Sequence, residues 1–313
     1  MKRNAFCTFV CAMIALVSFA QLPTLSSGSI ERHNAFPSKY IQARTVDVWL
    51  PEGYSKEKKY DVLYMHDGQM LFDSTQTWNQ QSWNIDETLS QLIREKKINE
   101  VIVVAIWNSG ATRHNDYFPQ KPFYSIPLQK RTKILNTLRT NGSKVFAHDT
   151  VQSDNYLKFI VHELKPFIDQ TYSTKKGKTH TFIAGSSMGG LISIYALCEY
   201  PQVFGGAACL STHWTGIYTL TDNPIPKAMI RYLAKKLPDP ATHKIYFDYG
   251  TTTLDTLYAP VQKKADQIMR LKGYNSSNWV TKAFKGEEHS EKAWAKRFSI
   301  PVLFLMKRNL WNR

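Results

Sequence analysis

One junction between a predicted strand and a predicted helix restricts the fold of this chain more than any other feature. The apolar run Thr181–Ala184 is typical of a buried strand, and helical spacing of apolar residues extends over 191–200. Between them lies Gly185-Ser186-Ser187-Met188-Gly189, in which small residues permit a sharp turn from strand to helix. Such a turn exposes its central serine at the carboxyl edge of a sheet, at a helix N-terminus. We therefore predict that Ser187 is a nucleophile and not part of a plain glycine–serine turn.

The remaining pattern alternates strands with helices and has no internal repeat. Strands are predicted at 40–50, 60–65, 101–106, 181–184, 205–210, 244–250 and 279–284, and helices at 86–97, 156–168, 191–200, 258–271 and 291–306. Because the run 101–106 is apolar throughout, we expect it to be covered on both faces. The alternation predicts an α/β protein with a doubly wound, mostly parallel central sheet.

The two ends of the predicted domain differ in character. Lys2 and Arg3 precede an apolar run, 5–20, that is short for a membrane span, so residues 1–20 are expected to be a cleaved secretory signal peptide, with an uncleaved anchor as the alternative. The Ser- and Pro-containing segment 21–36 is expected to be a flexible lead-in, and 37–313 a single domain. Within it, the long polar and aromatic excursion 108–150 is expected to be a lid-like insertion.

The formal charge of +15 is spread over short basic clusters. They lie at 56–59, 96–97, 175–178 and 235–236, each beside a predicted turn or helix end, where a solvated surface is the preferred interpretation. An exported protein meets little nucleic acid, so we expect no nucleic-acid partner, whereas attraction to anionic envelope surfaces or polyanionic substrates stays open. No stable membrane insertion is expected after signal cleavage. The sequence contains no cysteine–histidine spacing of the metal-binding type, and no metal or organic cofactor is expected.

A serine nucleophile needs a base and a group that orients the base, and in this type of fold they follow the serine in the order acid, histidine. His289 lies between the last predicted strand and the last predicted helix, which is where the fold presents its base. Two acids compete for the third position. Asp248 lies within a strand end, while Asp255 lies in the loop beyond it and is favoured because a loop residue can reach back to the imidazole.

Two further groups of residues are expected to face Ser187. The N–H of Met188 and the N–H of Gln69, which follows the close-approach residue Gly68, are expected to form an oxyanion hole, with a simple Asp67-Gly68 turn as the alternative. The candidate substrate-binding residues come from loops at the carboxyl edge, and the alternative for the aromatic ones is a core beneath a lid. These candidates are Trp107, Arg113, His213 and Trp214.

Together these motifs resemble the putative-esterase family of α/β-hydrolases. The motifs are Asp67-Gly68-Gln69 with Phe72, the helix 156–172, Gly185–Gly190, Gly250 with Asp255, and Gly286–His289 followed by Trp294. The resemblance covers most of the chain from about Tyr40 onward. It implies an α/β-hydrolase fold, a triad of Ser187, Asp255 and His289, and an oxyanion hole formed by Gln69 and Met188. Because the family includes feruloyl, acetylxylan and siderophore esterases, S-formylglutathione hydrolases and mycolyltransferases, the resemblance does not define one substrate.

The resulting hypothesis is a secreted or periplasmic serine esterase that forms an acyl-enzyme. The expected substrate is an acylated polysaccharide or a small phenolic ester, of the feruloyl or acetyl-xylan type. A siderophore (enterochelin-type) esterase and an acyltransferase are the enzymatic alternatives. A glycan- or envelope-binding protein on an inactive hydrolase scaffold is the non-enzymatic alternative, and the complete triad argues against it.

Overall fold

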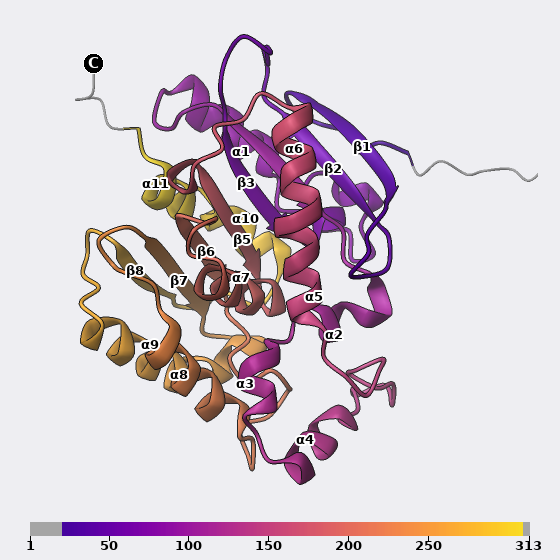
Figure 1. Cartoon of the computed structure of the whole chain (residues 1–313), viewed down its shortest axis with the longest axis vertical. Helices are drawn as coiled ribbons and strands as arrows, with labels where there is room; N and C mark the ends of the chain where they lie inside the picture. The colour runs from indigo at the N-terminus through magenta and orange to yellow at the C-terminus, as the bar shows by residue number, and fades with distance from the viewer. Residues whose placement is uncertain (1–20, 309–313) are drawn as a thin grey trace, which may run out of the picture.

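The computed structural model describes residues 21–308, and the expected signal peptide at 1–20 lies outside them. The described residues form one eight-stranded sheet with helices on both sides (Figure 1). The strands are β1 (Ser29–Phe36), β2 (Arg44–Leu50), β3 (Asp61–His66), β4 (Val101–Ile106), β5 (Thr181–Ser186), β6 (Gly206–Leu210), β7 (Lys244–Gly250) and β8 (Trp279–Phe284). None of the helices between residues 21 and 308 combines the length and apolar content that crossing a membrane requires.

The sheet has the order β1-β2-β4-β3-β5-β6-β7-β8. Strands β3 to β8 are all parallel, while β2 pairs antiparallel with β4 and β1 pairs antiparallel with β2. The predicted doubly wound, mostly parallel sheet is therefore confirmed. Since parallel strands point the same way, the loops that follow β3, β4, β5, β6, β7 and β8 all lie at one edge of the sheet.

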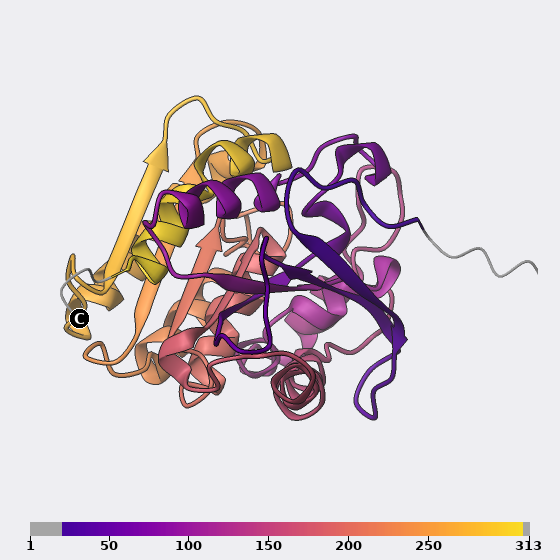
Figure 2. The ribbon, with the colours of Figure 1, turned by 90° about the horizontal axis from the view of Figure 1, so that it is seen from above.

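Helices cover both faces of the twisted sheet, as the view from above shows (Figure 2). One face carries α1 (Ile85–Arg94), α10 (Glu291–Arg297) and α11 (Ser299–Met306); the other carries α5 (Ser153–Lys158), α6 (Lys165–Thr171), α7 (Met188–Glu199), α8 (Ile225–Lys236) and α9 (Ala259–Leu271). A π-helical segment, Phe159–Leu164, joins α5 to α6. Each face has its own apolar core, so the central strands are buried on both sides, as their apolar sequences predict.

The expected flexible lead-in at 21–36 is wrong for residues 29–36, which form strand β1. Its residues pair with β2 from Ser29 opposite Leu50 to Phe36 opposite Arg44, with an irregularity between His33 and Phe36. The sequence of β1 is largely polar because an edge strand keeps part of its surface in solvent. The sequence pattern therefore lacked the apolar alternation that marks a half-buried strand.

The segment 108–150 has two different parts. Its first part contains α2 (Arg113–Tyr117) and α3 (Gln120–Tyr124). Tyr117 of α2, Phe123 of α3 and Phe118 between the two helices are buried in the core. Its second part begins with α4 (Leu128–Leu135), which is mostly exposed and projects at one end of the molecule (Figure 1). The aromatic residues of the first part therefore belong to the core, which is the alternative that the sequence left open.

The turn from β5 into α7 depends on the absence of side chains at two glycines. A Cβ atom on Gly185 would lie 2.8 Å from the backbone carbon of Gly189, and one on Gly189 would lie 3.3 Å from the Cβ of His66. The first of these distances is shorter than a carbon–carbon contact allows. The sharp turn therefore requires glycine at position 185, and at position 189 it leaves little room for a side chain.

We predict that Gly185→Ala lowers stability by about 2 kcal/mol, because the added methyl group must displace the backbone of α7. Thermal unfolding followed by circular dichroism measures this change. Gly177→Ala is the matched control, since its added Cβ would have no neighbour closer than 3.9 Å. Equal melting temperatures for the two variants would contradict this view of the turn.

Candidate active site

Ser187 occupies the turn in a conformation that few non-glycine residues adopt. Its φ and ψ angles are 56° and −121°, and it directly precedes α7. The backbone is held there because the Ser187 N–H donates to Leu210 O at 2.9 Å and its carbonyl accepts from the His213 N–H at 3.1 Å. Ser187 is partly exposed between buried neighbours. Strained backbone of this kind at the start of a helix is characteristic of a nucleophile elbow.

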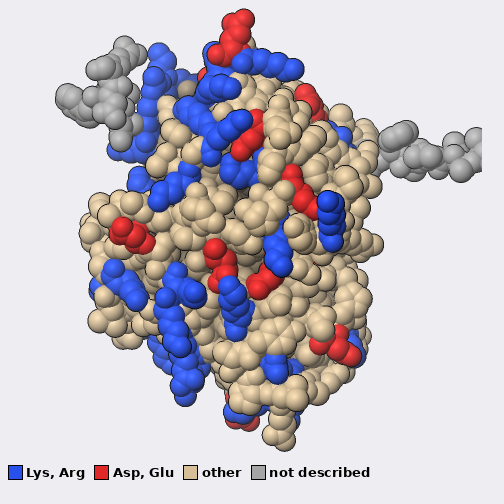
Figure 3. Space-filling view, in the orientation of Figure 1, with Lys and Arg blue, Asp and Glu red and all other residues tan. Residues whose placement is uncertain are grey.

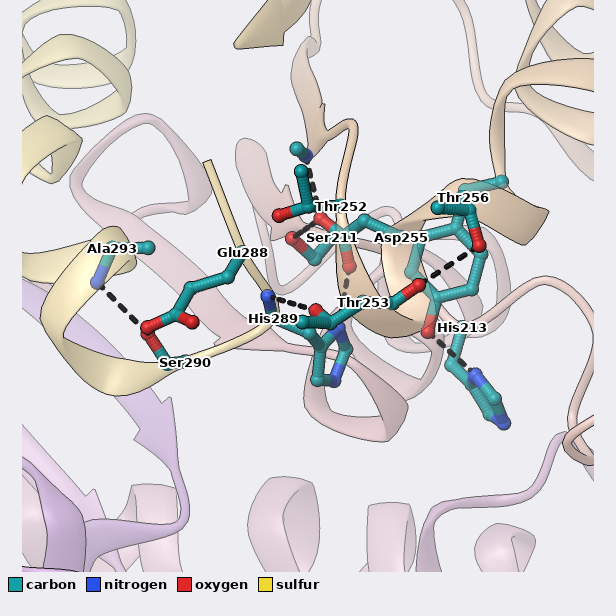
Figure 4. A network of polar contacts seen from close by, with 12 residues as sticks. Ser211, His213, Thr252, Thr253, Asp255, Thr256, Glu288, His289, Ser290 and Ala293 are labelled. Carbon is teal, nitrogen blue, oxygen red and sulfur yellow. Dashed lines mark hydrogen bonds and ion pairs between the residues drawn. The ribbon is translucent and has the colours of Figure 1, made fainter. Parts of the chain in front are cut away.

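His289 lies in the loop after β8, and its ring is fixed by the loop after β7. The Nδ1 atom of His289 lies 2.5 Å from Oδ1 of Asp255, and the His289 N–H donates to Thr253 Oγ1 at 2.8 Å. Figure 4 shows the two loops beside each other, with His289 next to Thr253 and Asp255. Because Nδ1 contacts the carboxylate, Nε2 is the ring nitrogen left for a substrate or a nucleophile.

Asp255 is a buried carboxylate with three donors. Besides its contact with His289, Asp255 accepts two hydrogen bonds at Oδ2. The Ser211 hydroxyl donates one at 2.6 Å and the Gly250 N–H donates the other at 2.5 Å. Burial favours the neutral acid, but the hydrogen bond and charge of His289, with the other two donors, hold the pKa of Asp255 below its usual value. Asp255 is therefore charged at neutral pH and able to orient the imidazole.

Asp248 has other partners and does not contact His289. Arg297 donates to both of its carboxylate oxygens, at 3.1 and 3.0 Å, and the Ser211 N–H donates to it at 3.1 Å. Both members of this ion pair are buried. The geometry thus brings Asp255, and not Asp248, to the imidazole.

The loop after β3 is held close to the sheet. A Cβ atom on Gly68 would lie 2.6 Å from the backbone of Ala105, so only glycine fits. The preceding residue, Asp67, has a left-handed backbone and accepts two hydrogen bonds of 2.7 Å from Arg113, from Nε and Nη2. Burial opposes its charge, but Arg113 and Asn108 lower the pKa of Asp67. This ion pair therefore anchors the backbone that leads into Gln69.

These loops surround a cavity of about 720 Å³. Ser187, His289, Gln69 and Met188 all line it, together with three tryptophans, Trp78, Trp83 and Trp294. Within residues 21–308, no hydrogen bond joins the Ser187 hydroxyl to His289. Met188 is the first residue of α7, so its N–H has no acceptor within the helix and is available to a bound group.

Two of the four substrate-binding candidates line this cavity and two do not. Arg113 and His213 line it, although the charge of Arg113 is already paired with Asp67. Trp214 is fully buried, and its indole N–H donates to Gln262 Oε1 at 2.7 Å. The indole N–H of Trp107 donates to Asp47 Oδ2 at 2.9 Å, and this residue borders a separate, small cavity. The prediction for these two tryptophans was therefore wrong. Each indole forms a hydrogen bond with a residue that does not line the main cavity. Neighbouring residues of a loop point in different directions, so a position in a loop near the site does not place the side chain in the cavity.

His213 has one free nitrogen in the cavity wall. Its Nδ1 lies 2.7 Å from the Tyr258 hydroxyl, while its Nε2 is buried and has no hydrogen-bond partner among the described residues. Burial lowers the pKa of His213 well below its usual value, so the ring is neutral at pH 7. His213 thus adds a neutral imidazole to the wall of the cavity.

Several residues of the site carry no signal in the sequence. Ser211 links both aspartates, and its hydroxyl also accepts from Trp294 Nε1 at 2.9 Å. Tyr258 holds His213, and Arg139, from the end of the 108–150 segment, donates to Tyr218 at 2.9 Å at the cavity rim. No common motif marks these residues, because each acts through a contact that only the folded chain creates.

The fold and the site together define the class of protein. A mostly parallel sheet, a strained serine between β5 and α7, and a histidine–aspartate pair after β7 and β8 are features of an α/β-hydrolase. The family model described as "Putative esterase" matches residues 38–305. The chain therefore belongs to this esterase family, and its enzyme class is that of the carboxylic ester hydrolases.

The chain is also similar to two curated proteins and to a solved structure. The chain is 25% identical over 180 residues to "Uncharacterized protein YjcH" of Bacillus subtilis, covering 57% of this chain and 60% of YjcH. It is 24% identical over 226 residues to an endo-1,4-beta-xylanase/feruloyl esterase of Xylanibacter ruminicola, covering 69% of this chain and 25% of that protein. The ferulic acid esterase AmCE1/Fae1A of Anaeromyces mucronatus has a similar fold, with a TM-score of 0.62, 18% identity, and coverage of 91% of this chain and 92% of that one.

The two aspartates are expected to respond differently to removal of their charge. Asp255→Asn should lower kcat by roughly three to four orders of magnitude in a protein that still folds, because the imidazole loses its orienting carboxylate. Asp248→Asn should instead destabilise the fold by about 3–5 kcal/mol, since Arg297 stays buried without its partner. Steady-state kinetics and thermal unfolding of both variants measure this. The reverse pattern would assign the acid to Asp248.

Proposed function

We propose that this protein hydrolyses a carboxylic ester through an acyl-enzyme on Ser187. The proposal rests on one observation: the charged, buried carboxylate of Asp255 lies 2.5 Å from the His289 ring, in a cavity that the partly exposed Ser187 also lines. A serine hydroxyl is too weakly acidic to attack an ester unaided, and an oriented imidazole is the base that such an attack needs.

In the proposed first step, Nε2 of His289 takes the Ser187 proton as Oγ attacks the ester carbonyl. Substrate binding brings the two groups together, since catalytic hydrogen bonds are often long before the substrate arrives. The negative charge that forms on the carbonyl oxygen is stabilised by the Met188 and Gln69 N–H groups and by the N-terminus of α7. The imidazolium then protonates the departing alcohol. Water then attacks the acyl-enzyme, with His289 again as the base, and the carboxylic acid is released from Ser187.

The proposed substrate is an acylated polysaccharide or a small phenolic ester. Two similar proteins carry the names feruloyl esterase and ferulic acid esterase. The cavity is also lined by Trp78, an exposed indole on which a sugar or a phenolic ring can stack. The neutral ring of His213 adds a polar group without charge to the wall of the same cavity. The basic and apolar N-terminal pattern of the sequence supports a secreted or periplasmic location for this activity.

Replacing the nucleophile should separate chemistry from folding. We expect Ser187→Ala to lose turnover of activated esters by several orders of magnitude and to lose labelling by a fluorophosphonate probe, with an unchanged melting temperature. The adjacent Ser186→Ala is the matched control and should still be labelled. A folded Ser187→Ala variant that retained turnover would refute the role of this serine, and an unlabelled wild-type protein would favour the inactive binding scaffold.

The substrate class can be tested with a panel of three esters. Methyl ferulate and acetylxylan should give higher kcat/KM values than a ferric catecholate trilactone, because the neutral His213 ring and the Trp78 indole suit neutral, oxygen-bearing rings. Product analysis with and without an added acceptor sugar separates hydrolysis from acyl transfer. Turnover of the trilactone alone would contradict the polysaccharide or phenolic assignment.

A further inference from the structure

Three basic clusters that are far apart in the sequence lie together at the edge of the sheet opposite the candidate active site. They precede β3, β4 and β5, and these strands are parallel, so their amino ends share one edge. The segment before β3 contacts the segment before β5: the Tyr60 N–H donates to Ser173 O at 2.9 Å and the Lys175 N–H to Tyr60 O at 2.8 Å. The end of α11 joins them, because the Arg308 N–H donates to Lys97 O at 3.0 Å.

This surface, which we call the basic edge, consists of residues 56–61, 95–100, 175–180 and 307–308. It contains ten lysines and arginines against four aspartates and glutamates, a net charge of +6. Figure 3 shows lysine and arginine side chains gathered over the upper part of the molecule, where Figure 1 places the C-terminal end of the described chain. Close spacing of like charges is unfavourable in the isolated protein and becomes favourable when an anion binds.

Only part of this charge is compensated within the protein. Three lysines form ion pairs, Lys58–Glu100, Lys97–Glu95 and Lys175–Asp61, and Asp61 also contacts His180 Nδ1 at 2.8 Å. The other seven cations have no carboxylate within 4 Å in the part of the chain that the structure describes; they are Lys56, Lys59, Lys96, Lys176, Lys178, Lys307 and Arg308. Uncompensated cations on one surface attract a ligand with several negative charges.

The basic edge contains a groove that can hold a ligand. A cavity of about 860 Å³ is lined by Lys178, Lys307 and Arg308 and extends to Lys244 at the start of β7. Polar side chains such as Asn99 and Thr179 line it as well. The groove thus offers cations for carboxylate or phosphate groups and hydrogen-bonding groups for hydroxyls.

We propose that the basic edge binds an anionic polysaccharide, with the acidic groups of the polymer against the lysines and its hydroxyls in the groove. None of the exposed large apolar side chains of residues 21–308 lies in the four segments of the basic edge. Binding of single-stranded nucleic acid relies on aromatic stacking, and binding to membranes relies on apolar anchors, so neither is favoured. The site is independent of the esterase activity, since it lies at the opposite edge of the sheet.

The test is affinity electrophoresis in gels that contain polygalacturonate or a neutral arabinoxylan, with Ser187→Ala as the parent so that binding is separated from hydrolysis. We expect retardation by polygalacturonate only, weakening as salt is added. The double variant Lys178→Glu/Lys307→Glu should bind about tenfold more weakly. The matched control is Lys235→Glu/Lys236→Glu, which makes the same charge change at the exposed end of α8 and should bind like the parent.

Any one of three other results would overturn the proposal. Equal loss in both double variants would mean that net charge, and not the basic edge, causes the retardation. Absence of retardation of the parent would remove the site altogether. Equal affinity for polygalacturonate and for single-stranded DNA would show a surface without preference for polysaccharide. Circular dichroism of both variants, and the same substitutions in the Ser187 background assayed on an activated ester, verify that the fold and the catalytic site are intact.

Discussion

The candidate active site depends on the hydrogen bonds that keep a buried carboxylate, that of Asp255, charged. Removing a carboxylate from water is costly, and Asp255 is 1% exposed. The cost is offset by donors from three segments: His289, the Ser211 hydroxyl and the Gly250 N–H. Each of these contacts also fixes the position of a loop. The charge of Asp255 therefore organises the loops after β6, β7 and β8 around one point.

The parallel sheet supplies the geometry that this network needs. Because β5 to β8 are neighbours in the sheet and point the same way, Ser187, Ser211, Asp255 and His289 all emerge at the same edge. On the other side of Ser187, the Asp67–Arg113 ion pair joins the loop after β3 to α2. The same parallel arrangement places the loops before β3, β4 and β5 at the opposite edge, where they form the basic edge.

Much of the fold could be predicted from the sequence, because the apolar runs of the central strands and the Gly-x-Ser-x-Gly turn reflect burial and close approach directly. Strand β1 could not, since an edge strand needs few apolar residues. For the candidate site, the positions of Ser187, His289 and Asp255 relative to the predicted strands were sufficient to bring them to one edge. Trp107 and Trp214 were misplaced because sequence position gives the loop but not the direction of the side chain. The convergence of the basic clusters could not be predicted from the sequence either, because it depends on which strands are neighbours in the sheet.

We propose that catalysis proceeds through a covalent ester on Ser187. Mass spectrometry of enzyme quenched during turnover of a slowly hydrolysed ester tests it most directly. We predict that the mass of one acyl group is added to the proteolytic peptide that contains Ser187, and that the adduct disappears once the substrate is exhausted. Turnover with no adduct, or with an adduct on another residue, would contradict this account.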